Sequence, residues 1–355
     1  MIIPARDAAG TLVEALDSVA SQSAGDFEAL IVDDRSSDAT AEIAAARAAA
    51  DKRFVLLEAE GEGVSAARNT ALAASTGAYV VFLDADDVLT PDSLAVRLAW
   101  MRANKGARFV SCMWDAIGPK GEVLAPGMGR LASPRRFDTA FEFPVHIGAV
   151  MGVGSLLRQY RFDPARDHGE DHEFLIDVTR NGVTLHPCHE VVLRYRWSAG
   201  SAVSANADRH CEALISLWDQ YIGPPAPGVR SAPEFAEGWS VDSVRPRQLA
   251  LLRELAVRQA MHGDAEGVER ALRRCAAFDP WAGAERAHLD GESLWFVAAR
   301  AYLKPFASAA LAEQACGAVG ALLALADRVR DYPQFAGAVR GFVDQALAAA
   351  GELAA

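Results

Sequence analysis

The first hundred residues alternate between short apolar segments and segments of helical character, and this alternation constrains the fold more than any other feature of the sequence. Apolar runs rich in strand-forming residues lie at residues 2–3, 27–32, 54–57 and 79–83. Segments of helical character follow them and end near residues 21, 50, 75 and 103. Such alternation gives parallel strands joined by right-handed crossovers. The sequence therefore predicts an α/β fold, with a mostly parallel, Rossmann-like sheet flanked by helices.

Three carboxylates follow the run at residues 79–83 almost without a break: Asp84, Asp86 and Asp87. The carboxyl ends of parallel strands form the edge at which open α/β sheets bind ligands. Carboxylates this close repel one another, and a bound divalent cation relieves that repulsion. A solvated acidic turn is the alternative, and the stretch by itself does not choose between the two.

A second pair of carboxylates, Asp33 and Asp34, follows the second predicted strand and should face the same edge of the sheet. A carboxylate there can accept hydrogen bonds from a nucleobase or a ribose, or it can simply form a turn. Gly63 opens a predicted helix that carries Arg68 on its first turns. A helix N-terminus with an arginine nearby suits a diphosphate, whereas an ordinary surface arginine is the alternative.

A third group of acids, Glu170 and Asp171, starts a predicted helix after Gly169. Such residues can complement the helix dipole, or one of them can act as a general base toward an attacking hydroxyl group. The histidines of this part of the chain match no zinc-binding spacing. We therefore expect ordinary surface or core roles for most of them: 146, 168, 172, 186 and 189.

Composition narrows the class of protein. The net charge of −12 argues against a general nucleic-acid-binding protein, although a metal ion can still bridge the chain to a nucleotide. The five cysteines are scattered without a Cys-x-x-Cys pair, which is typical of reduced thiols in a cytosolic protein. We find no apolar run of transmembrane length and no leader peptide. The sequence thus predicts a cytoplasmic location.

Beyond residue 108 the pattern changes. We expect a hairpin over residues 108–124, a loop over the site at residues 126–147, and strands at residues 152–158 and 191–197. After residue 205 strand-type segments disappear. The expected domains are a catalytic domain at residues 1–205, a connecting helix at 206–222, a proline-rich linker at 223–246 and an all-α C-terminal region at 247–355.

Together, the motifs at residues 4–7, 32–40, 63–69, 82–87 and 169–171 resemble, in order and spacing, those of family-2 glycosyltransferases. The resemblance covers roughly residues 1–205. It implies a GT-A fold and an inverting transfer from a nucleotide sugar, usually UDP-linked. The expected acceptor is a hydroxyl group of a glycan or lipid-linked molecule in surface polysaccharide synthesis.

The resemblance also implies roles for individual residues. Asp171 would be the general base, and Glu170 would support it. Asp86 would coordinate Mg²⁺ or Mn²⁺, with Asp84 touching the metal or the ribose. The remaining donor-binding residues would be Pro4 at the base pocket, Arg6 in the same motif, Asp34 at the uracil or ribose, and Arg68 near the diphosphate.

One departure from the family concerns a Tyr-Arg-x-His segment whose histidine can reach the metal or phosphate. Here Ser198 stands at that position, and Arg196 is a candidate to supply the positive charge. Two other functions are compatible with a sheet of this kind: a non-catalytic module that binds nucleotide sugars or proteins, and a sugar nucleotidyltransferase. The latter normally has a glycine-rich phosphate loop after the first strand, where this chain has residues 4–10. The C-terminal helices are candidates to contact the inner face of the membrane, a protein partner or another copy of the chain, and the net charge of −12 does not favour direct lipid binding.

Overall fold

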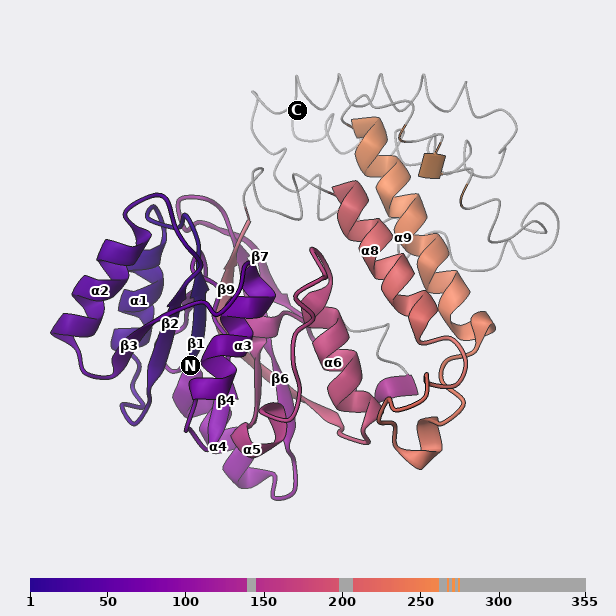
Figure 1. Cartoon of the computed structure of the whole chain (residues 1–355), viewed down its shortest axis with the longest axis horizontal. Coiled ribbons are helices and arrows are strands. Elements are labelled where there is room, and N and C mark those ends of the chain that lie inside the picture. Colours follow the sequence, from indigo (N-terminus) through magenta and orange to yellow (C-terminus); the bar gives the residue numbers. More distant parts are fainter. Residues whose placement is uncertain (139–144, 198–206, 262–266, 268–269, 272–273, 275–355) are drawn as a thin grey trace, which may run out of the picture. The chain divides into compact units, whose positions relative to one another are not determined.

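The computed structural model describes residues 1–138, 145–197, 207–261, 267, 270–271 and 274. The chain divides into two compact units (Figure 1). Unit 1 comprises Met1–Ala205 with Ala213–Ser240, and unit 2 comprises Asn206–Glu212 with Val241–Ala355. All the sequence motifs described above lie in unit 1.

Unit 1 begins with three parallel strands in the order β1-β2-β3: Ile2–Ala5, Ala29–Asp33 and Phe54–Glu58. The crossover helices are α1 (Leu12–Ala20) and α2 (Thr40–Ala50). β1 and the first four residues of β2 are buried. Their register pairs Pro4 with Val32 and Ala5 with Asp33, so the loops that follow the two strands start at the same level.

The chain continues through α3 (Val64–Ala74) to β4 (Tyr79–Val81). Just past β4, Phe82 forms a parallel bridge with Ile2, and the amide of Leu83 donates to the carbonyl of Ile2 at 3.0 Å. The carboxylates at residues 84–87 therefore emerge beside the end of β1, at the edge of the sheet that the sequence predicts.

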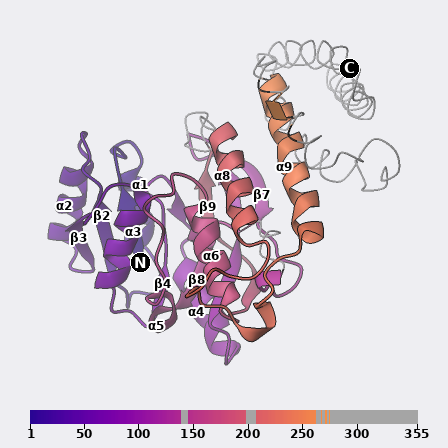
Figure 2. The same ribbon diagram turned by 45° about the vertical axis from the view of Figure 1, so that its right-hand side comes forward.

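The second sheet has the order β4-β8-β6-β9-β5, with β7 paired to β6. Its further strands are Val88–Leu89 (β5), Phe109–Ile117 (β6), Val123–Met128 (β7), Val150–Val153 (β8) and Leu185–Arg196 (β9). The pairing of β6 with β9 is parallel, and the other pairings in this sheet are antiparallel. The helical segments in this part of the chain are α4 (Ser93–Ala103), η2 (Ile147–Ala149), α5 (Gly154–Leu157) and α6 (Glu170–Arg180). Figure 1 and Figure 2 label α4, α5 and α6 in two views.

The α/β class, the parallel first half and the hairpin of β6 and β7 agree with the sequence predictions. Three details differ. The second sheet is largely antiparallel, and β9 begins at Leu185, before the predicted residue 191. Residues 154–157, expected to be part of a strand, form α5, because a short apolar run is compatible with either conformation and the contacts of the fold decide. The amide of Gly154 still donates to the carbonyl of Ala78, in register with the antiparallel pairing of β8 with β4, and the helical turn follows directly.

The segment expected to be a linker is partly structured. Residues 223–240 belong to unit 1, where Trp239 stacks on Phe137 with ring centroids 5.0 Å apart. α8 (Ala207–Gln220) falls within the predicted connecting helix, but α9 (Val241–Met261) begins inside the predicted linker. Pro246 lies inside α9, beyond its first turn, where it has no N–H to donate to the carbonyl of Asp242. Most of the predicted helical region lies outside the described residues.

Among the described helices, none combines the length and the hydropathy needed to cross a bilayer.

Candidate active site

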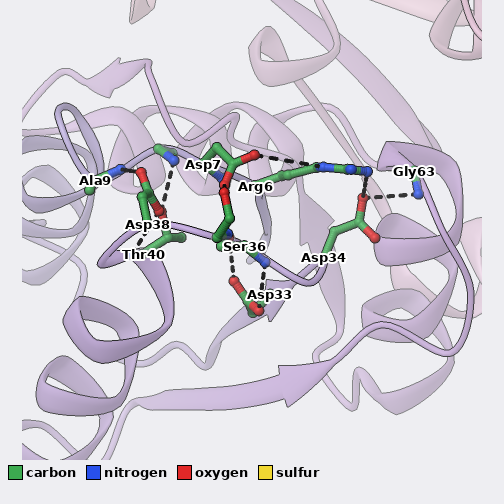
Figure 3. A network of polar contacts seen from close by, with 11 residues as sticks. Arg6, Asp7, Ala9, Asp33, Asp34, Ser36, Asp38, Thr40 and Gly63 are labelled. Atoms are coloured by element: carbon green, nitrogen blue, oxygen red, sulfur yellow. Dashed lines mark hydrogen bonds and ion pairs between the residues drawn. The ribbon is translucent and has the colours of Figure 1, made fainter.

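The loops after β1 and β2 are fastened to each other by side-chain hydrogen bonds to backbone amides (Figure 3). The Asp7 carboxylate accepts from the Ser37 amide at 2.7 Å, and the Asp38 carboxylate accepts from the Ala9 amide at 3.0 Å. Asp33 accepts from the Ser36 hydroxyl at 2.6 Å, which makes it a turn-forming residue. These bonds hold the edge of the first sheet in one conformation before any ligand binds.

Asp34 is buried beneath these loops, with only 2% of its surface exposed. Its Oδ2 accepts from the Gly63 amide at 2.9 Å and from Arg6 Nη1 at 3.3 Å (Figure 3). Gly63 has a φ of +90°, a conformation that favours glycine, so a side chain there would strain this contact. Asp34 Oδ1 is buried and has no partner among the described residues. An unpaired buried carboxylate oxygen is suited to accept a hydrogen bond from a ligand.

Arg68, on α3, bridges two of the acidic motifs. Its Nη2 donates to Asp84 Oδ1 and its Nη1 donates to Glu170 Oε1, both at 2.8 Å. The guanidinium is buried and lies over the ring of Phe162, 5.3 Å from its centroid. Burial disfavours its charge, but Asp84 and Glu170 outweigh that effect and raise the pKa of Arg68. The bridge brings the end of β4 and the start of α6 together.

The carboxylates after β4 are crowded and poorly hydrated. Burial, with the neighbouring charge of Asp84, raises the pKa of Asp86 to about 6. Asp87 is fully buried, and burial with the charges of Asp84 and Asp86 raises its pKa well above the usual range. A site in which acids oppose one another's ionisation is one that a cation stabilises. The donor set of hard carboxylate oxygens fits Mg²⁺ or Mn²⁺.

Asp84 and Asp87 also lie close to His146, which precedes η2. One ligand atom from each of these three residues falls within 4.8 Å of the others, and Asp86 does not belong to this group. The sequence does not identify His146 as a site residue, since its spacing matches no metal-binding motif. The expectation of a loop over the site at residues 126–147 was the only signal that could have pointed to it.

Asp171 and Glu170 occupy the first turn of α6, after Gly169 in the left-handed conformation. Burial opposes the ionisation of Asp171, but the charges of His172 and Arg68 and a hydrogen bond from the His172 amide outweigh it and lower its pKa. Burial and the charge of Asp171 raise the pKa of Glu170. Asp171 is therefore the more readily ionised member of the pair, and Glu170 is the partner of Arg68.

Arg196 contacts the backbone of the segment at residues 84–87, which we call the acidic loop. Its Nε donates to the Asp86 carbonyl at 2.8 Å, its Nη1 to the Pro119 carbonyl at 3.1 Å, and its Nη2 to Glu14 Oε2 at 2.6 Å. These bonds hold the guanidinium in place, whereas the sequence analysis considered it a source of charge for the site. Pro4 is buried in β1, and Ser198 lies outside the described residues.

Comparison with known proteins gives one family match: residues 1–163 match the model of glycosyl transferase family 2. WfgD of Escherichia coli, a UDP-Glc:alpha-D-GlcNAc-diphosphoundecaprenol beta-1,3-glucosyltransferase, is 28% identical over 230 residues, which is 63% of this chain and 87% of WfgD. An uncharacterized glycosyltransferase of Rickettsia conorii is 28% identical over 218 residues, 61% of this chain and 36% of that protein. The chain spans about a third of the length of the first curated relatives it matches.

Among solved structures, the mannosyltransferase PcManGT of Pyrobaculum calidifontis, in complex with GDP-Man and Mn²⁺, resembles the chain with a TM-score of 0.51. It is 20% identical, and the match covers 98% of this chain and 86% of that one. This likeness concerns the fold.

Proposed function

We propose that the protein is an inverting glycosyltransferase that uses a nucleotide-sugar donor, because residues 1–163 match the model of glycosyl transferase family 2. The proposed donor is a UDP-sugar, and the proposed acceptor is a hydroxyl group of a glycan or lipid-linked molecule in polysaccharide synthesis. The bridge of Arg68 to Asp84 and Glu170 carries the proposal, because it joins the carboxylates after β4 to the acids that begin α6.

The donor nucleotide would bind at the ends of β1 and β2. Asp34 Oδ1 is the unpaired acceptor there, and an N–H of the base or a hydroxyl of the ribose would satisfy it. Pro4 and Arg6 flank this position from β1 and the loop after it. The relative WfgD carries UDP-Glc in its name, which supports a UDP-linked donor.

The diphosphate would lie over the carboxylates after β4. Asp86, with Asp84 beside it, would hold Mg²⁺ or Mn²⁺. When bound, such an ion neutralises the charge that develops on the leaving diphosphate. Arg68 donates one hydrogen bond from each Nη group, to Asp84 and to Glu170, and would contribute to the diphosphate site through its own charge and by fixing the position of Asp84.

Asp171 would act as the general base. It takes the proton from the acceptor hydroxyl as the hydroxyl oxygen bonds to the anomeric carbon of the sugar, and the bond from that carbon to the diphosphate oxygen breaks. The lowered pKa of Asp171 keeps it ionised at neutral pH, as a base requires. A single base with no enzymic nucleophile makes one displacement, which inverts the anomeric centre.

The test is release of nucleoside diphosphate from UDP-glucose, UDP-GlcNAc and GDP-mannose in the presence of Mn²⁺. We expect release from one of them, loss of release with EDTA, and loss in Asp86→Ala. Asp92→Ala is the matched control, because Asp92 is exposed and caps no amide of α4. Binding of a sugar nucleotide without turnover of any acceptor would instead indicate a non-catalytic module. Synthesis of a nucleotide sugar from UTP and a sugar 1-phosphate would indicate a nucleotidyltransferase.

A further inference from the structure

His146 faces the one carboxylate of the acidic loop that is completely buried. Its Nε2 lies 3.8 Å from Asp87 Oδ2. Asp87 Oδ1 accepts from the Arg196 amide at 2.8 Å, whereas Oδ2 has no hydrogen-bond partner among the described residues. A buried carboxylate oxygen without a donor is costly, and an N–H on His146 Nε2 would supply one. A bond of ordinary length needs the two atoms to approach by roughly 0.8 Å.

The proton position on His146 follows from its other nitrogen. Nδ1 accepts a hydrogen bond from the Gly148 amide at 3.1 Å, so it carries no proton. A neutral imidazole has one N–H, which must then be on Nε2, toward Asp87. A histidine that bound a metal ion through Nε2 would use the lone pair of Nε2 and carry its proton on Nδ1. The Gly148 amide opposes that form, because it donates to Nδ1.

The Gly148 peptide is itself held firmly. Its carbonyl accepts from Arg97 Nη2 at 2.7 Å, and the same fully buried guanidinium donates to the Val150 carbonyl at 3.3 Å. A Cβ at position 148 would lie 3.1 Å from His146 Nδ1 and 2.9 Å from Leu193 Cδ2. The ring also packs against Tyr195, at 4.6 Å between centroids. The imidazole is thus oriented from several sides.

We propose that His146 is a positioning residue, which donates from Nε2 to Asp87 and so holds the loop of Asp84 and Asp86 in its cation-binding conformation. It is not a ligand of the cation. The inference rests on the proposed function in assigning the cation to that loop. The exposure of the acids agrees with this division: Asp87 is fully buried, whereas the Asp84 side chain is 26% exposed and can reach a substrate.

The tautomer is tested without metal, by long-range ¹H–¹⁵N NMR of the full chain labelled with ¹⁵N-histidine. His146 is assigned from the signals that disappear in His146→Gln. We expect an unprotonated Nδ1 and a protonated Nε2 at neutral pH. A protonated Nδ1 with a free Nε2, the form a metal ligand needs, would overturn the proposal.

The role is tested by the affinity of the full chain for Mn²⁺ alone, measured by electron paramagnetic resonance. A glutamine amide reaches about as far as Nε2 and donates, whereas a glutamate offers a ligand oxygen but no donor. We expect His146→Ala to weaken Mn²⁺ binding by about tenfold, the loss typical of an outer-shell partner. His146→Gln should recover it, and His146→Glu should weaken it at least as much as alanine. Recovery of Mn²⁺ affinity by glutamate and not by glutamine would show that His146 is a ligand and would overturn the proposal. Wild-type affinity in all three variants would also overturn it, because His146 would then have no role in Mn²⁺ binding.

Two controls separate this inference from the proposed function. His186→Gln changes a histidine that contacts Trp100 away from the acidic loop, and it should bind Mn²⁺ as the wild type does. Asp86→Ala should lose Mn²⁺. If Asp86→Ala binds normally, the proposed cation site is wrong, whatever the variants of His146 do. If Asp86→Ala loses Mn²⁺ binding but His146→Gln binds Mn²⁺ as weakly as His146→Ala, only the role of His146 is wrong.

Discussion

Replacing Arg68 by methionine removes the bridge between Asp84, after β4, and Glu170, at the start of α6. The methionine keeps an apolar side chain over Phe162. The arginine is 4% exposed, and its partners Glu170 and Asp84 are 13% and 26% exposed. In the variant, both carboxylates lose the guanidinium that neutralises them while they remain poorly hydrated. Removing one partner of a buried ion pair typically costs about 3–5 kcal/mol of unfolding free energy, and the partial exposure of Asp84 favours the lower end, about 3 kcal/mol.

The assay is urea denaturation of the full chain, with Arg35→Met as the control. Arg35 forms an ion pair of the same length, 2.8 Å, with Glu62, but both side chains are more than half exposed. Such a pair contributes about 0–1 kcal/mol, so the control should differ little from the wild type. The double variant Arg68→Met/Glu170→Gln removes the stranded charge and should recover about 1–2 kcal/mol of the loss.

The pH dependence gives a second check. Burial and the charge of Asp171 already raise the pKa of Glu170 above its usual 4.5, and loss of Arg68 should raise it further. The folded state then binds this proton more tightly than the unfolded chain, so the unfolding free energy falls as the pH rises through the raised pKa. The deficit of Arg68→Met should therefore be larger at pH 8 than at pH 5. A deficit as small as that of Arg35→Met, or one that grows on acidification, would refute the assigned role of the bridge.

Two further predictions concern ligands. Asp34→Ala should weaken the binding of UDP, measured by calorimetry, by about 10–100-fold, because a charged hydrogen-bond acceptor contributes about 1.5–3 kcal/mol. Asp33→Ala removes a turn contact with Ser36 and no unpaired acceptor, so it should weaken UDP binding less. Equal losses in the two variants would contradict the role of Asp34. Because the pKa of Asp86 is raised to about 6, protons should compete with Mn²⁺ below that pH. The affinity for Mn²⁺ should then fall by up to about tenfold per pH unit. An affinity for Mn²⁺ that is constant from about pH 7 to about pH 5 would contradict this prediction.

Much of the fold follows from the sequence because the signals are local. The alternation of apolar and helical segments specifies the parallel first half, and the order of the motifs specifies which acids share an edge. The second half was less predictable, because short runs such as residues 154–157 suit either a strand or a helix until tertiary contacts decide.

The candidate site also contains residues that local signals identify and residues that only tertiary contacts reveal. Asp34, Asp84 and Asp171 each follow a recognisable strand or begin a helix, and the structure places them in one unit. His146 gives no such signal, because its role arises from the approach of Asp87 and from the Gly148 peptide that orients its ring. The charge that the sequence predicts for Arg196 acts on Asp86 and Asp87, but the carbonyl groups of Gly118 and Pro119 that hold its guanidinium belong to a distant hairpin, and no local pattern reports those contacts.

The central claim is that Asp171 transfers the proton during sugar transfer, and the most direct test compares Asp171→Asn with Glu170→Gln. The measurement is steady-state release of UDP from the UDP-sugar that the wild type uses, together with calorimetric binding of the same donor. The account predicts that Asp171→Asn binds the donor like the wild type but releases UDP about 10²–10⁴-fold more slowly. Glu170→Gln, which keeps an oxygen for Arg68, should retain most of the activity. Full activity in Asp171→Asn, or a larger loss in Glu170→Gln, would contradict the account.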